Sequence, residues 1–207
     1  GALKNNVLTD HNLRFILEIY NVDTKGDIDY TDCYRTQSIG KDTYTSFPVR
    51  LVPGHEYKIV VWADFVAKDA VELADNDLYY ETSNGLDEIT FIAGKDTAMT
   101  EARDAYYAVY TLESNKTASS IPTLTLKRPF AKIRVITTDL KECAEMSDMV
   151  PTQATITYTS TVNDKFNAVN KQVYAVSPNS VKTVKYPSVY GDASTLFVDY
   201  ILVDQFN

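Results

Sequence analysis

Alternation of apolar and polar positions is the strongest signal in this 207-residue chain, and a period of two is typical of β-strands. The clearest examples are residues 13–19, where every odd position is apolar, and residues 154–162, where four threonines share one face. The same reasoning predicts strands at residues 57–63, 121–126, 130–136 and 196–203. The 15 tyrosines agree with this, because aromatic and β-branched side chains suit a pleated surface.

Helical signals are few. Asp139 is a potential N-cap for one short helix that Pro151 ends. Residues 100–109 fit either a second helix or a strand that begins near Ala105. Turns are predicted at Gly26, which can adopt a positive φ angle, and at Pro53-Gly54.

Many short strands separated by turns predict a mostly-β fold of antiparallel β-sandwich domains. The polar run at residues 114–120 is the best candidate for a boundary. We therefore expect an N-terminal sandwich over residues 1–120 and a second over residues 121–207, which would contain the short helix.

The last predicted strand is apolar on both faces except for Asp199, which indicates an internal strand of the second sandwich. We expect that sandwich to be incomplete at its C-terminal end, so that sequence following Asn207 would supply a missing edge or an exchange strand. The candidates for an assembly strand are the residues of one face, namely Leu196, Val198, Tyr200 and Leu202.

Composition narrows the possible functions. A formal net charge of −8 argues against nucleic-acid binding, because the phosphate backbone needs a basic surface. No apolar run is long enough to span a membrane. The two histidines, His11 and His55, lie in no motif, and no Gly-x-Ser-x-Gly or phosphate-binding loop is present. We expect no catalytic, cofactor-binding or metal site and no enzymatic activity.

Three features carry candidate chemistry of other kinds. The acidic stretch between Asp64 and Glu88 is interpreted as a solvated loop, with a calcium site as the alternative. Cys33 and Cys143 fall in different expected domains, so we predict two free thiols, although a bridge between them would be stabilising. Trp62, the single tryptophan, is interpreted as a core residue, with an exposed sugar-stacking platform as the alternative.

Four segments together resemble the fimbrillin-like surface proteins of Bacteroidales. They are YKIVVWAD at residues 57–64, DLYY at 77–80, LKRPFAKI at 126–133 and FNA at 166–168. The resemblance implies two transthyretin-like β-sandwiches made as exported lipoproteins of the outer membrane. It also implies subunits that join into pili by strand exchange, and it carries over no catalytic residue.

The expected function is therefore that of a structural subunit or adhesin of a bacterial surface fimbrium. Its partners would be other fimbrial subunits and a host or bacterial surface ligand, with membrane attachment only through a lipid anchor. The alternative is a carbohydrate-binding β-sandwich of the cell surface that uses Trp62 or a tyrosine cluster as its stacking platform.

Overall fold

The fold is mostly β and antiparallel, as predicted. A computed structural model describes residues 9–72, 74–92, 94–95, 100–139, 142, 145–146, 153–160, 162–174, 181–185 and 194–204. The predicted helix after Asp139 lies largely outside these residues, so it stays a prediction.

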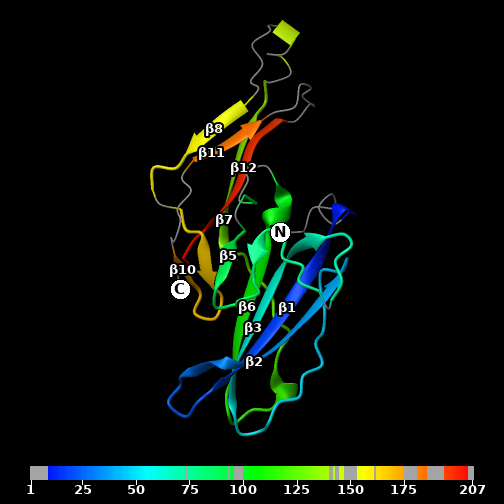
Figure 1. Ribbon diagram of the computed structural model, residues 1–207, viewed down its shortest axis with the longest axis vertical. Helices are drawn as coiled ribbons and strands as arrows, with labels where there is room; N and C mark the ends of the chain where they lie inside the picture. Colours follow the sequence, from blue (N-terminus) through cyan, green and yellow to red (C-terminus); the bar gives the residue numbers. More distant parts are fainter. Residues whose placement is uncertain are drawn as a thin grey trace.

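The larger sheet, sheet A, has four long antiparallel strands in the order β2-β1-β3-β6 (Figure 1). The central strands β1 (His11–Val22) and β3 (Glu56–Ala67) pair along their whole length. The edge strands are β2 (Ile28–Gly40) and β6 (Ala105–Leu112). The loop between β1 and β2 turns at Gly26, whose φ angle of 89° is in the region that favours glycine.

Four short strands form sheet B in the order β10-β9-β5-β4. They are β4 (Tyr80–Glu81), β5 (Ile89–Phe91), β9 (Lys165–Asn167) and β10 (Gln172–Tyr174). Because β5 pairs with β9, this sheet joins segments from both sides of residue 120. The division into units at residue 120 stays a prediction, but strand pairing crosses it.

Two antiparallel ribbons lie beyond sheet A in the upper part of Figure 1. In one, β7 (Phe130–Thr137) pairs with β12 (Ser194–Leu202). In the other, β8 (Gln153–Thr157) pairs with β11 (Val181–Lys185). Two single-turn 3-10 helices, η1 (Glu101–Arg103) and η2 (Ala118–Ser120), precede β6 and follow it.

The main core lies between one face of sheet A, here called the inner face, and the strands of sheet B together with β12. Trp62 is at its centre, fully buried, and contacts the rings of Tyr80 and Phe166. The interpretation of Trp62 as a core residue is therefore confirmed. The other members come from every part of the chain, among them Ile16, Val60, Tyr107, Phe130, Val198, Tyr200 and Leu202.

The structure decides two predictions on either side of the polar run at residues 114–120. Residues 100–109 form η1 and then a strand from Ala105, so the strand alternative is confirmed. The strand predicted at residues 121–126 is wrong: the segment is extended but belongs to no ladder. Pro122 has no N–H to donate, and only the neighbouring Lys127 pairs with a strand residue, Tyr107.

Candidate functional site

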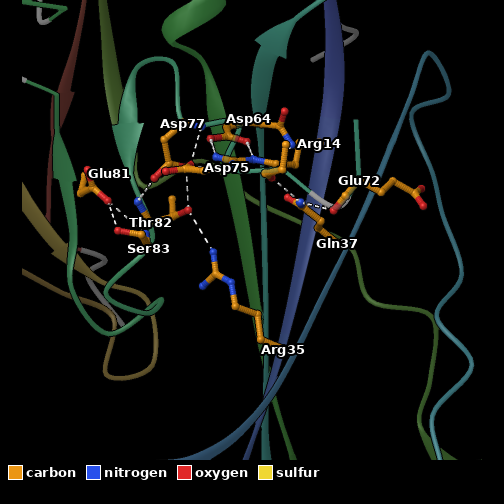
Figure 2. Close-up of polar contacts among 12 residues, drawn as sticks. Arg14, Arg35, Gln37, Asp64, Glu72, Asp75, Asp77, Glu81, Thr82 and Ser83 are labelled. Atoms are coloured by element: carbon orange, nitrogen blue, oxygen red, sulfur yellow. Dashed lines mark hydrogen bonds and ion pairs between the residues drawn. The ribbon is translucent and has the colours of Figure 1, made fainter. Parts of the chain in front are cut away.

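A buried ion-pair network lies on the inner face of sheet A. Arg14 of β1 and Asp64 of β3 stand opposite each other in register. Arg14 donates from Nε to Asp64 Oδ1 (2.8 Å) and from Nη2 to Asp64 Oδ2 (2.6 Å). Its Nη1 donates to Asp77 Oδ1 at 2.7 Å, so one guanidinium holds two carboxylates (Figure 2).

The interpretation of the acidic stretch as a solvated loop is wrong for Asp64 and Asp77. Their side chains are only 1% and 6% exposed. Burial raises the pKa of Asp64, and Arg14 opposes that shift. Burial also lowers the pKa of Arg14, but the two carboxylates outweigh it and raise that pKa above its ordinary value.

The network continues through Asp77 to the neighbouring edge strand. Thr82 donates to Asp77 from its N–H (2.6 Å) and its hydroxyl (2.8 Å), and Arg35 of β2 donates to Thr82 Oγ1 (3.1 Å; Figure 2). Arg35 also pairs with the buried Glu18, which accepts from the Leu86 N–H at 2.8 Å. These contacts attach residues 77–86 to sheet A. The carboxylates of Asp64, Asp77 and Glu18 all accept hydrogen bonds from groups of the same chain.

A second buried ion pair connects η1 to β12. Arg103 and Asp199 are both fully buried, and Arg103 Nη1 lies 2.6 Å from Asp199 Oδ1. Tyr158 donates its hydroxyl to the other oxygen of Asp199 at 2.7 Å. This contact joins residues 96 positions apart in the chain and holds β12 against sheet A.

The outer face of sheet A, opposite the main core, forms the floor of a long apolar groove of about 910 Å³. Alternate residues of the two central strands make this floor. They are Leu13, Phe15, Leu17 and Ile19 of β1 with Ile59, Val61 and Ala63 of β3. Phe15, Ala63 and Tyr106 lie in one register row, and Ala63, the smallest of the three, is buried beneath the side chains that pack on this face.

Two extended segments, here called the groove walls, border this floor. The first wall is residues 43–49, and its Phe47 and Val49 pack against the floor. The second wall is residues 121–126, and its Ile121, Leu124 and Leu126 also pack against the floor. The N–H of Ile121 donates to Ala118; otherwise no residue of either wall forms a backbone-to-backbone hydrogen bond with another described residue. The groove therefore combines an apolar floor with walls whose backbone groups have no strand partner.

Three of the four candidate assembly-strand residues lie in the main core. Val198, Tyr200 and Leu202 are 4%, 1% and 3% exposed, and Leu196 is half-buried. The strand pairs with β7 along one edge, and at its other edge Leu202 forms a bridge with Asn163. β12 therefore packs within its own chain, and its role in assembly stays a prediction.

Cys33 is a half-buried free thiol of β2, and Cys143 lies outside the described residues. Burial, together with the negative charge of Glu18, raises the pKa of Cys33 to about 11.

We expect Cys33 to react slowly with a thiol reagent in the folded protein at pH 8, because little of it is thiolate. In a Cys143→Ser variant, the rate of labelling should rise at least about tenfold on denaturation, since the model-peptide pKa is about 8.5. A Cys33→Ser variant controls for the other thiol. Equal labelling rates for folded and denatured Cys143→Ser protein would contradict a raised pKa of the half-buried Cys33 thiol.

Sequence reasoning missed both the ion-pair network and the groove. A signal for the network existed, because Arg14 and Glu18 are the only polar residues in the otherwise apolar run of residues 13–20. No signal marked the groove, since alternation at residues 121–126 predicts a paired strand equally well.

The described residues hold no group of three or more His, Cys, Asp or Glu side chains that could bind a metal ion. His11 contacts Phe65 and Tyr79, and His55 contacts Tyr57, so the structure places the two histidines in different surroundings. In the same part of the chain, no helix has the length and apolar character needed to cross a membrane.

Comparison with known proteins gives one result. Neither the curated proteins nor the solved structures include a match to this chain. A family model described as "Family of unknown function (DUF6562)" matches residues 1–207. The chain therefore belongs to the family DUF6562.

Proposed function

We propose that this protein is a structural subunit of a bacterial surface fimbrium, exported to the cell surface and assembled by strand addition between subunits. The observation that carries the proposal is the groove on the outer face of sheet A. The resemblance of four segments to fimbrillin-like proteins supports the same assignment. The proposed partner is an extended apolar segment of a second subunit.

The groove has the two properties that such a segment needs. Its floor is apolar at every second position along β1 from Leu13 to Ile19, which matches the side-chain period of a strand, and a donor would take the place of wall side chains that now bury these residues. Its walls offer backbone N–H and C=O groups without strand partners. Strand addition gains affinity from main-chain hydrogen bonds and specificity from pockets for alternate side chains.

The length of the floor sets the size of the donor segment. Residues 13–19 span seven positions, so a donor of roughly seven residues would place three or four side chains on the floor. Each large apolar side chain that becomes buried contributes roughly 1.5–3 kcal/mol. A contact between the groove of one subunit and a different segment of the next is head-to-tail, and it extends into a filament when successive copies do not close a ring.

A larger side chain on the groove floor tests this proposal. Ala63→Leu adds a branched side chain to the floor, and it should lower assembly of the full chain by at least about tenfold at a given concentration. Assembly is measured by sedimentation and light scattering over a concentration series. Because Ala63 is buried beside Phe15 and Phe65, urea denaturation of each variant accompanies the assay, and assembly is compared only under conditions where both variants are folded.

Ala67→Leu is the matched control, because Ala67 lies on the same strand and the same face but is exposed and outside the groove. This variant should assemble like the original chain. A chain that stays monomeric throughout the series, or an Ala63→Leu variant that assembles as well as Ala67→Leu, would contradict strand addition at this groove.

A further inference from the structure

A second hollow, here called the edge pocket, lies on the same outer face between the edge strand β2 and residues 48–52. Its volume is about 720 Å³. Ile19, Val49, Leu51 and Tyr57 form its apolar part. The edge pocket adjoins the groove and shares Ile19 and Val49 with it, whereas Asp32, Tyr34 and Arg50 line the edge pocket alone.

Four polar or aromatic side chains converge on the edge pocket. Asp32 and Tyr34 lie two residues apart on β2 and therefore share a face, and Tyr34 stands opposite Ile19 in register. Asn21 at the end of β1 donates to Asp32 Oδ2 over a long 3.4 Å contact. Arg50 reaches the pocket from the opposite side.

These groups keep most of their hydrogen-bonding capacity. Among the described residues, neither the Tyr34 hydroxyl nor the Arg50 guanidinium has a hydrogen bond or an ion pair, and Asp32 has the single weak contact with Asn21. Tyr34 is 53% exposed, so part of its aromatic side chain faces solvent beside these donors and acceptors. A few polar groups around an apolar hollow are typical of small-molecule sites.

We propose that the edge pocket binds a neutral saccharide. A pyranose ring has an apolar C–H face that can stack on Tyr34 and a rim of hydroxyls. The Asp32 carboxylate can accept a hydrogen bond from one sugar hydroxyl, and the Asn21 amide can donate to a neighbouring one. The Arg50 guanidinium can donate to a hydroxyl on the other side of the ring. One carboxylate and one guanidinium balance in charge, which favours a neutral ligand. Trp62 has no part in this site, because it is fully buried.

The test is binding of the full chain to a printed array of neutral and acidic oligosaccharides, followed by titration with the neutral oligosaccharide bound best. Tyr34→Ala should weaken binding by at least about tenfold, and Tyr34→Phe should retain it because the ring remains. Asp32→Asn should also weaken binding. Circular dichroism melting curves establish that each variant is folded.

Tyr174→Ala is the matched control, since Tyr174 is also an exposed strand tyrosine but lies on β10 in sheet B. It should bind like the original chain. Absence of binding to every neutral oligosaccharide would overturn the assignment, as would binding that Tyr34→Ala leaves unchanged. The assignment does not depend on fimbrial assembly, because neither Tyr34 nor Asp32 lines the groove.

Discussion

Replacing Arg103 with methionine is expected to destabilise the fold by about 3–5 kcal/mol, because the buried carboxylate of Asp199 loses its cation. The effect should be large since both side chains are fully buried and water cannot replace the missing partner. Chemical denaturation with urea measures the free energy of unfolding. The loss should include the packing of β12, whose Val198 and Tyr200 lie in the main core.

Two further variants make this prediction sharper. Lys116→Ala removes an exposed ion pair with Glu113 and should change the stability by less than about 1 kcal/mol. The double variant Arg103→Met with Asp199→Leu should be less destabilised than the sum of the single variants, because no uncompensated charge remains. A loss below about 1 kcal/mol for Arg103→Met would show that the pair contributes little.

Arg14→Met should have an effect of similar size, about 3–5 kcal/mol at pH 7.5, because it leaves Asp64 and Asp77 without their shared cation. Residues 77–86 should also lose protection from hydrogen exchange, since Asp77 anchors them to Arg14 and Thr82. Arg35→Met is the comparison: its side chain is 34% exposed, so solvent screens the pair with Glu18 and the loss should be smaller.

The Arg14→Met variant should also depend on pH in a defined direction. Burial raises the pKa of Asp64, and removing Arg14 removes the group that opposes this shift. A carboxyl whose folded-state pKa is raised adds stability below its unfolded pKa of about 3.9 and loses it as the pH rises. The deficit of the variant relative to the original chain should therefore be smaller at pH 4.5 than at pH 7.5, and an equal deficit would contradict burial as the cause.

The long strands β1, β3 and β12 were predictable because their buried residues impose an alternating or apolar pattern, whereas β7 carries such a pattern although only Phe130 of it is buried. β1, β3, β7 and β12 all fall where alternation predicts them. β2 was missed, because it is an edge strand with most of its first half exposed, and burial imposes no pattern on such residues. The strands of sheet B have only two or three residues each, so they depend on pairing between distant segments such as residues 89–91 and 165–167.

The ion-pair network and the groove could not be predicted from the sequence, for a different reason. The partners of Arg14 lie 50 and 63 positions away, and only the register of β1 against β3 brings Asp64 beside it. The groove depends on the absence of a strand between its two walls in the described part of the chain, and the pattern of apolar and polar residues does not show whether a predicted strand has a partner. Residues 121–126 have the composition of a strand, and Ile121, Leu124 and Leu126 pack on the outer face of sheet A, yet the segment pairs with no described strand.

Hydrogen exchange at the groove walls is the sharpest test of whether the groove accepts a strand from another subunit. Amides of residues 43–49 and 121–126 are followed by mass spectrometry in the dilute subunit and in the assembled material separated by sedimentation. Amides of β1, already paired on both edges, serve as the internal reference. Strand addition predicts fast exchange at both walls in the subunit and strong protection in the assembled material, and Ala63→Leu should abolish this change. Walls that exchange equally fast in both states, or walls already protected in the dilute subunit, would contradict it.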